Sequence, residues 1–254
     1  MAGSCARTEI LVGQLGLAQL AESHVVIAGL GGVGGACAES LCRAGIGELT
    51  LIDFDLVAKT DLNRQIIALH STLGKSKVEV LSKRLTDINP DTVVNEMNLF
   101  IDGKKAEEIA NEEDYNFVAD CIDAIACKTN LIDACNRFNK PIISSMGAGG
   151  RLDPTKVTIS RMDKTEYCGL ARELRRQLRL KRASLKFPVV HSTEVQIKAL
   201  PHEAVHKTEF SPPGRPRAVN GAISYMPNIF GLMMAGHIIP VSYTHLTLPT
   251  IYSV

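Results

Sequence analysis

A glycine-rich segment between residues 29 and 34 has the pattern of a phosphate-binding turn. The segment Gly29-Leu-Gly-Gly-Val-Gly34 follows a short apolar run, 24–30, and precedes a stretch with helical periodicity. Glycines permit a tight turn and let the backbone approach a ligand, and the unpaired N–H groups at the start of a helix attract phosphate. We therefore expect a nucleotide to be bound by Gly29, Gly31, Gly32 and Gly34.

Two acidic residues follow where nucleotide-binding domains hold a ribose. Asp53 comes directly after a second apolar run, 48–52, and Asp55 lies two residues further on. An acid at the end of the second strand accepts hydrogen bonds from ribose hydroxyls in such domains. The glycine segment and the acid together indicate a nucleotide, but they do not distinguish NAD from ATP.

The segment after Asp55 favours a triphosphate. Asn63-Arg64-Gln65 and then Lys77 place cations beyond the second strand, where a dehydrogenase has little use for them. When a carboxylate attacks a phosphate, negative charge builds on the phosphate, and fixed cations stabilise that charge. We predict ATP as the cofactor, with Arg64 and Lys77 as catalytic and phosphate-binding residues and Asn63 as a further ligand.

An alternation of strands and helices is expected to position these residues. Apolar runs of strand length alternate with helical patterns through the first 150 residues, and such alternation produces parallel βαβ units. The predicted fold class is α/β, with a Rossmann-like, doubly wound and mostly parallel sheet. The expected strands are 24–30, 48–52, 92–99, 117–122 and 141–144, and the expected helices are 33–41, 76–88, 104–110 and 131–138.

The pattern changes after Gly149-Gly150. We divide the chain into an ATP-binding part, 1–150, and a C-terminal α+β extension, 151–239, within the same domain or as a subdomain. The extension is expected to contain strands at 156–160 and 187–190, a basic helix near 170–178, a mobile loop at 204–217 and a buried helix at 231–239. Residues 240–254 show neither periodicity, and we expect a non-native tail there, with the true C-terminus missing.

Composition excludes several classes of protein. The 254 residues carry 28 Lys+Arg against 27 Asp+Glu, which excludes a polybasic or acidic tail protein. No apolar run reaches the roughly 18 residues of a membrane helix, and the N-terminus has no signal-peptide pattern, so we expect no membrane association and a cytoplasmic location. The 7 cysteines include no C-x-x-C pair, which argues against a disulfide framework and a four-cysteine zinc site.

Residues 24 to 77 resemble the ubiquitin-activating-enzyme-like adenylating family. The resemblance implies that Asp53 binds ribose hydroxyls and that Arg64 and Lys77 bind phosphates. It also implies that Asp123, in Asp120-Cys-Ile-Asp123, is a catalytic residue that holds Mg²⁺. Arg7, in Ala6-Arg-Thr-Glu9, matches an arginine that reaches the partner subunit's ATP, which implies a homodimer with shared ATP sites and a catalytic role for Arg7.

One position departs from this family. The family usually has an asparagine where this chain has Asp61. An acid close to a triphosphate would repel it, so three explanations stay open. Asp61 points away, the site is weakened, or Asn63 supplies the amide.

The second half resembles one branch of the family, the tRNA threonylcarbamoyladenosine dehydratases. The matching segments are 4–9, 69–71, 87–90, 164–168 and 221–225. This implies ATP-dependent cyclisation, a dehydration, of threonylcarbamoyladenosine in tRNA through a carboxyl-adenylate, with that tRNA as partner. Cys168 aligns with a cysteine of the branch. It is either a nucleophile or sulfur relay, which would involve a sulfur-transfer protein partner, or an incidental buried thiol.

The basic helix is the candidate for tRNA contact. Leu170, Leu174 and Leu178 form an apolar stripe, so several arginines fall on the outer faces. Contacts of this kind bind phosphate without selecting a sequence. A merely solubilising face is an equal alternative. The candidate contacts are Arg172, Arg175, Arg176, Arg179, Lys181 and Arg182.

Three other functions stay open on the sequence. The first keeps the fold but activates the C-terminal glycine of a sulfur-carrier protein. The second is an NAD(P)-dependent oxidoreductase, which Arg64 and Lys77 argue against. The third is a non-catalytic nucleotide- or RNA-binding module, which Asp61 motivates.

Overall fold

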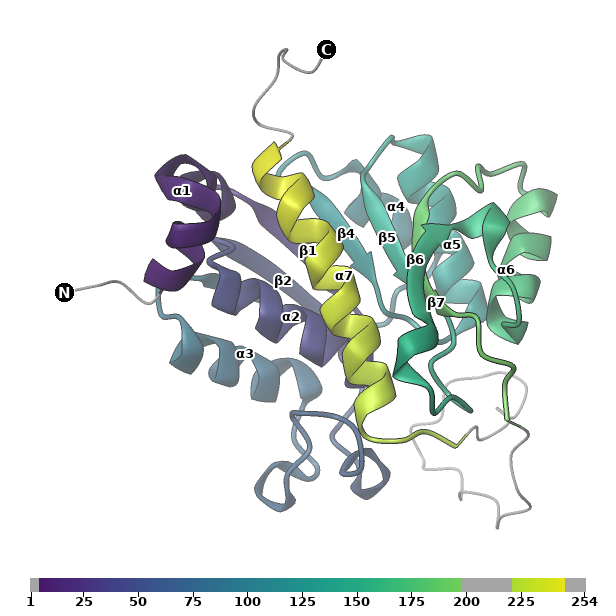
Figure 1. Ribbon diagram of the computed structural model, residues 1–254, viewed down its shortest axis with the longest axis horizontal. Helices are drawn as coiled ribbons and strands as arrows, with labels where there is room; N and C mark the ends of the chain where they lie inside the picture. The colour runs from purple at the N-terminus through teal and green to yellow at the C-terminus, as the bar shows by residue number, and fades with distance from the viewer. Residues whose placement is uncertain (1–4, 198–220, 245–254) are drawn as a thin grey trace.

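A seven-stranded sheet in the order β3-β2-β1-β4-β5-β7-β6 forms the centre of the protein (Figure 1). The computed structural model describes residues 5–197 and 221–244. The strands are β1 (His24–Ala28), β2 (Glu48–Asp53), β3 (Val93–Asn98), β4 (Phe117–Asp120), β5 (Ile142–Ser145), β6 (Val157–Arg161) and β7 (Pro188–Ser192). Every neighbouring pair is parallel except β6 and β7, which are antiparallel. The predicted α/β, mostly parallel fold class is therefore confirmed.

Helices cover both faces of the sheet (Figure 1). The side chains of β1 alternate between two cores, with Val25 and Ile27 in one and Val26 and Ala28 in the other. The first core includes residues of α2 (Gly32–Ala44), α3 (Lys77–Ile88) and α7 (Tyr225–Thr244). The second includes residues of α4 (Gly103–Asn111), α5 (Ile125–Arg137) and α6 (Gly169–Leu180). Because both faces are covered, the central strands β1, β4 and β5 are buried at every residue, including the polar Asp120, Ser144 and Ser145.

The second half of the chain continues the same sheet. β7 lies between β5 and the edge strand β6, so the sheet crosses the boundary drawn at residue 150. Helix α7 packs along α2, and at Gly231 a Cβ would lie 2.2 Å from the carbonyl oxygen of Val33. Glycine at this position therefore lets the last helix approach the first turn of α2.

Two helices differ from the sequence-based expectation. Helix α1 (Ala6–Ala21) was not predicted, and its periodicity is interrupted at Gly13, which has φ 72° and ψ 171°. Helix α7 begins before the expected 231 and continues through Pro240 to Thr244. Proline removes one helical hydrogen bond, but Val241 and Tyr243 pack against the core and continue the helix.

The remaining elements match their predicted positions to within a few residues, except that α5 begins six residues before the expected 131. The predicted loop at 204–217 lies outside the described residues, as does 245–254. Among the helices that the structure describes, none is long and apolar enough to cross a membrane.

Candidate functional site

The carboxyl ends of the parallel strands open into a cavity of about 780 Å³. Ligands of open α/β sheets bind at this edge because loops from neighbouring strands meet there. The cavity is lined by the glycine segment, by the ends of β2, β4 and β5, and by the start of α6. Its lining includes Gly29, Gly31, Gly32, Asp53, Asp55, Asp61, Arg64, Lys77, Asp123 and Cys168.

The glycine segment forms the turn between β1 and α2. Gly29 has φ 90°, and a Cβ there would lie 3.0 Å from the carbonyl oxygen of Cys121. At Gly34 a Cβ would lie only 1.8 Å from the carbonyl oxygen of Gly29, so Gly34 closes the turn and is not part of the lining. Gly29, Gly31 and Gly32 remain as the wall that a ligand can approach, at the N-terminus of α2.

Asp53 is held in place by the backbone on both sides. The Leu30 N–H donates to Asp53 Oδ2 at 2.6 Å, and the Asp55 N–H donates to Asp53 Oδ1 at 2.8 Å. Each oxygen therefore keeps a lone pair for a hydroxyl donor. Burial raises the pKa of the Asp53 carboxyl, while nearby Lys77 and these N–H groups act in the opposite direction.

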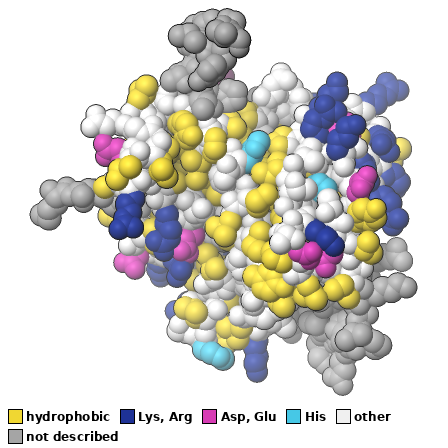
Figure 2. Space-filling model, in the orientation of Figure 1, with side chains coloured by type: hydrophobic (Ala, Val, Ile, Leu, Met, Phe, Trp, Pro, Cys, Tyr) yellow, Lys and Arg dark blue, Asp and Glu magenta, His cyan; other side chains and the backbone are white. Residues whose placement is uncertain are grey.

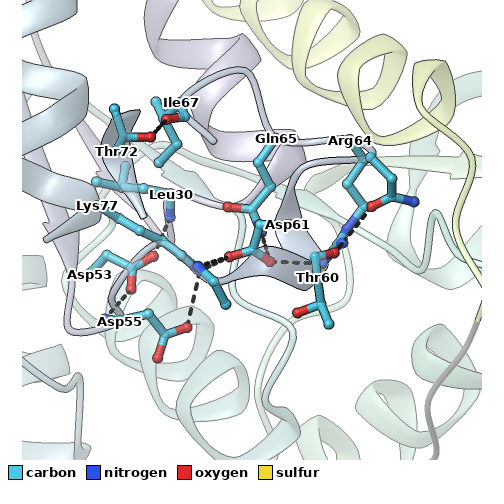
Figure 3. Close-up of polar contacts among 12 residues, drawn as sticks. Leu30, Asp53, Asp55, Thr60, Asp61, Arg64, Gln65, Ile67, Thr72 and Lys77 are labelled. Atoms are coloured by element: carbon cyan, nitrogen blue, oxygen red, sulfur yellow. Dashed lines mark hydrogen bonds and ion pairs between the residues drawn. The ribbon is translucent and has the colours of Figure 1, made fainter. Parts of the chain in front are cut away.

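Lys77 lies at the start of α3 with its ammonium group among carboxylates (Figure 3). Its Nζ is 3.2 Å from Asp55 Oδ2 and 3.7 Å from Asp61 Oδ2, and the side chain is 7% exposed. Burial alone would lower the pKa of Lys77, but three nearby carboxylates outweigh it and the pKa is raised. Lys77 therefore remains a cation on the cavity wall at neutral pH.

Arg64 lines the same cavity, with Asp61 between it and Lys77 (Figure 3). Its Nη1 donates to the carbonyl oxygen of Thr60 at 2.8 Å and to Asn63 Oδ1 at 3.0 Å. Its Nη2 donates to Asp61 Oδ1 at 3.4 Å. The guanidinium is thus held in place by short local contacts. Because the side chain is already ordered, it loses little further conformational freedom when a ligand binds.

The structure answers the question left open at Asp61. Asp61 ends the short 3-10 helix Lys59–Asp61, is buried and lines the cavity, so it does not point away. Asn63 is outside the lining, because its amide donates to the carbonyl oxygen of Ala222 at 2.9 Å. Asn63 Oδ1 accepts from Arg64 Nη1, so Asn63 supports Arg64, and its direct contact with a ligand stays a prediction.

Among the lining residues that sequence reasoning did not single out, three make contacts that shape the site, namely Gln65, Phe54 and Phe100. Gln65 Nε2 donates to Asp61 Oδ1 at 2.7 Å, and Gln65 follows Arg64 directly. Phe54 and Phe100 follow β2 and β3, and their rings meet edge to face with centroids 5.2 Å apart. The signal available for Phe54 was its place between Asp53 and Asp55. Phe100 could be paired with it only once β2 and β3 were known to be neighbours.

A buried ion pair supports the loop that carries Asp123. Lys128 Nζ lies 2.8 Å from Asp120 Oδ2, and both side chains are 0% exposed. The same Nζ donates to the carbonyl oxygen of Ile122 at 2.9 Å, and Ser144 Oγ donates to Asp120 Oδ2 at 2.6 Å. This network fixes the loop after β4, and Asp123 at its tip lines the cavity.

Cys168 lines the cavity at the N-cap of α6. Its Sγ accepts a hydrogen bond from the Ala171 N–H at 3.4 Å, and the residue is 8% exposed. Gly147 approaches it closely, since a Cβ there would lie 3.6 Å from Cys168 Sγ. The thiol is therefore mostly covered but belongs to the cavity lining.

Arg7 is not brought to the cavity of its own chain. It is an exposed residue of α1, outside the lining. Three apolar side chains of the same helix are also exposed, namely Ile10, Leu11 and Leu15, at 83%, 87% and 66%. This placement leaves the predicted contact of Arg7 with a second subunit as a proposal.

Helix α6 presents most of its basic residues outward. Ala171, Leu174 and Leu178 are buried, and Lys and Arg side chains gather at the edge of the molecule where α6 lies (Figure 2). Arg175 differs, because its Nη1 donates inward to Thr165, to the carbonyl oxygen at 2.9 Å and also to the hydroxyl. Arg176 pairs with Glu173, and Lys181 with Asp133. Within the described residues, no ion pair is found for Arg172, Arg179 and Arg182.

A second cavity is lined mainly by carboxylates and has no lysine or arginine in its described lining. It has a volume of about 400 Å³ and lies near the amino ends of β1 and β2. It is lined by His24, Tyr115 and four carboxylates, those of Glu22, Glu48, Glu112 and Asp114. An anionic ligand is disfavoured there, so the cavity at the carboxyl edge is the candidate site.

Comparisons with known proteins identify the family of this chain. Residues 6–251 match the ThiF family. The tRNA threonylcarbamoyladenosine dehydratase of Bacillus subtilis (strain 168) is 34% identical over 238 residues, which are 92% of this chain and 92% of that protein. The molybdopterin-synthase adenylyltransferase of Escherichia coli (strain K12) is 36% identical over 149 residues, which are 59% of this chain and 58% of that protein.

A solved structure has the same fold over nearly the full length. The crystal structure of E. coli tRNA N6-threonylcarbamoyladenosine dehydratase, TcdA, in complex with ATP superimposes with a TM-score of 0.83 at 31% identity. It covers 95% of this chain and 94% of that chain. Family, fold and cavity thus agree with the resemblance drawn from residues 24 to 77, and this chain belongs to the ThiF family.

Proposed function

We propose that this protein catalyses the ATP-dependent cyclisation of threonylcarbamoyladenosine in tRNA through a carboxyl-adenylate. The observation that carries the proposal is the cavity in which the glycine turn faces Arg64 and Lys77. Support comes from the named dehydratases that align with this chain and from the ATP held by the E. coli enzyme.

The cavity has a place for each part of ATP. The glycine turn and the N-terminus of α2 face phosphates, and Asp53 accepts from ribose hydroxyls. Phe54 and Phe100 form an apolar rim beside Asp53 that fits the adenine ring. Arg64 and Lys77 then lie toward the triphosphate.

The reaction needs charge stabilisation and positioning more than a protein nucleophile. The threonyl carboxylate attacks the α-phosphate, an acyl–phosphate bond forms, and pyrophosphate leaves. An atom of the modified base then attacks the activated carbonyl, a ring closes, and AMP leaves. Arg64 and Lys77 stabilise the charge that develops in the first step. The second step is intramolecular, so holding the base in place supplies most of the acceleration.

The chemistry of Asp123 fits Mg²⁺ as the companion of ATP. Among the residues that the structure describes, no group of three or more His, Cys, Asp or Glu side chains is arranged to hold a metal. Mg²⁺ in nucleotide sites is held mainly by phosphates and water with one or two carboxylates, so a single carboxylate at the cavity is sufficient. Mg²⁺ bound at Asp123 would neutralise part of the phosphate charge.

Two further surfaces complete the proposal. Arg172, Arg179 and Arg182 on α6, with Arg176 and Lys181, would bind tRNA phosphates. A second copy of this chain would cover the exposed apolar residues of α1 and bring Arg7 to the neighbouring ATP site. With tRNA as substrate, the protein would act in the cytoplasm.

Cys168 is the candidate for an added sulfur or acyl relay. Its place in the same lining as Arg64 supports contact with an activated carbonyl. A sulfur-transfer protein partner follows only if the thiol is used. Replacing Cys168 with Ala tests this. Unchanged turnover assigns the thiol to packing, and a loss beyond tenfold with a normal melting temperature assigns it to the reaction.

The direct test is AMP formation from ATP in the presence of bulk tRNA. We expect AMP and pyrophosphate with tRNA that carries threonylcarbamoyladenosine, and neither with tRNA that lacks the modification. Mass spectrometry of the digested tRNA should show the loss of one water. AMP release that does not depend on the modification would refute the proposal.

One second candidate has a specific observation in its favour. The molybdopterin-synthase adenylyltransferase of E. coli is 36% identical to this chain over 149 residues, which are 59% of this chain. The substrate would then be the C-terminal glycine of a carrier protein. Pyrophosphate exchange into ATP stimulated by a carrier protein, and not by modified tRNA, would favour this candidate.

A further inference from the structure

Asp61 accepts three hydrogen bonds and forms an ion pair with Lys77. Figure 3 shows its carboxylate between Lys77 and Arg64. Oδ1 accepts from Gln65 Nε2 at 2.7 Å and from Arg64 Nη2 at 3.4 Å. Oδ2 accepts from the Ala58 N–H at 3.1 Å and lies 3.7 Å from Lys77 Nζ. The carboxylate therefore lies between the two cations of the cavity wall and is 6% exposed.

The cations do not depend on Asp61 for their positions. Arg64 has closer acceptors in Thr60 and Asn63, at 2.8 Å and 3.0 Å. Lys77 has a closer partner in Asp55, at 3.2 Å. For both cations Asp61 is the most distant of these acceptors, so its main effect on them is to neutralise charge.

We propose that Asp61 is an internal counter-anion that shares Arg64 and Lys77 with the triphosphate and thereby lowers the affinity for ATP. The inference deepens the proposed function and rests on it, since it assumes that phosphates bind beside these cations. An incoming phosphate replaces Asp61 as a partner of Arg64 and Lys77. The shorter contacts of these two cations with their other partners are kept. Asp61 then stays behind the phosphates as a repelling charge.

The wall is rich in carboxylates even without Asp61. Asp53 and Asp55 line the same cavity, next to only two cations, Arg64 and Lys77. Two like unit charges about 4 Å apart repel each other by about 1 kcal/mol even in bulk water, and by more at a protein surface. Removing one negative charge beside a polyanion should therefore strengthen binding by about tenfold or more. The gain should grow with the number of phosphates on the ligand.

Changing Asp61→Asn should remove the charge and keep the fold. The amide oxygen can still accept from the Ala58 N–H, and the amide nitrogen would then face Gln65. Gln65 Oε1 is buried and has no hydrogen-bond partner among the described residues, so rotating the Gln65 side-chain amide supplies the acceptor. The site thus offers an alternative hydrogen-bond pattern for an amide at position 61.

The experiment measures dissociation constants for ATP, ADP and adenosine by calorimetry. We expect Asp61→Asn to bind ATP about tenfold more tightly, ADP with a smaller gain, and adenosine with no change. A residue that served only the fold would weaken all three ligands. The matched control is Asp87→Asn, which removes the same charge at an exposed position near the end of α3 and should change none of the constants.

A second variant restores the negative charge at the neighbouring side chain, Gln65. Asp61→Asn combined with Gln65→Glu restores the net charge of the wall, and the affinity for ATP should return toward the wild-type value. A gain that persists in the double variant would overturn the inference. Failure of Asp61→Asn to fold would do so too, because the rotated Gln65 amide should accommodate it.

The remaining outcomes separate this inference from the proposed function. If the wild type binds ATP and Asp61→Asn binds it no more tightly, only the role of Asp61 is refuted. If neither protein binds ATP, the proposed function fails, and the inference fails with it.

Discussion

The cavity wall and the outer face of α6 both present cations, but in opposite surroundings. Lys77 on the wall is 7% exposed. Lys128, which supports the loop after β4 from outside the lining, is 0% exposed, and each of the two has a carboxylate partner within 3.2 Å. On α6, by contrast, Arg176 is 59% exposed. A buried cation has a fixed position and is screened little by salt, whereas an exposed cation contributes a field that salt weakens. The first setting suits chemistry on a phosphate, and the second suits attraction of a long polyanion.

The largest expected effect comes from breaking the most buried pair. Lys128→Met leaves Asp120 without its counter-ion at 0% exposure, and we expect the free energy of unfolding to fall by about 3–5 kcal/mol. Chemical denaturation checks this value. Lys83→Met, at a surface position 73% exposed, is the control and should change it by less than about 0.5 kcal/mol. A similar decrease in the free energy of unfolding in both variants would contradict the difference between buried and exposed cations.

Removing the guanidinium from the wall should affect the reaction and not the fold. We expect Arg64→Ala to lower the rate of AMP formation by about 100-fold or more, as the loss of a transition-state donor typically does. The effect should be the same at low and high salt. Arg84→Ala, an exposed arginine of α3, serves as the control. A defect that disappears at saturating ATP would limit Arg64 to ground-state binding.

Lowering the pH tests whether two buried histidines can become cations. Burial lowers the pKa of His191 and of His237. Above about pH 6.5 both rings are neutral in the folded and unfolded chain, so their contribution to stability is complete. As pH falls below this value, the unfolded chain takes up protons first. The free energy of unfolding should then decrease, by at most about 1.4 kcal/mol per pH unit for each histidine.

Denaturation curves between pH 7.5 and 5 measure this loss. His237→Leu should flatten the dependence on pH, and His70→Gln, at an exposed position, should not. A stability that stays constant down to pH 5 would contradict the lowered pKa values.

The smallest expected effect belongs to α6. Changing Arg172 and Arg179 together to Glu should weaken tRNA binding about tenfold at moderate salt and reduce the slope of log affinity against log salt. The reaction rate at saturating tRNA should change little, since these residues lie outside the cavity lining. Lys83→Glu on α3 is the matched control. An unchanged salt slope would assign α6 to solubility.

The periodic elements and the glycine turn could be predicted because their determinants are local. Glycines, alternating apolar runs and the end of α2 at Gly45, with φ 96°, are visible in neighbouring residues. Helix α1 was missed because its apolar side chains are exposed and Gly13 interrupts it. The pairing of Phe54 with Phe100, and the inward turn of Arg175, depend on segments brought together by the sheet.

The role of Asp61 could not be predicted from the sequence at that position alone. Its departure from the family pattern was visible in the sequence, but three explanations fitted it equally. The structure shows that Asp61 lines the cavity and contacts Ala58, Arg64, Gln65 and Lys77, the last of which is 16 residues away along the chain. A carboxylate near phosphates is interpretable only when its partners are known.

The packing of α7 along α2 has a consequence for biosynthesis. The glycine turn and α2 leave the ribosome early, but the helix that covers them is made last among the described elements. Until then Leu41, Cys37 and the neighbouring apolar side chains of α2 lack part of their cover. The nascent protein therefore exposes the apolar face of α2 until α7 is made, and we expect chaperones that bind apolar segments to contact it there.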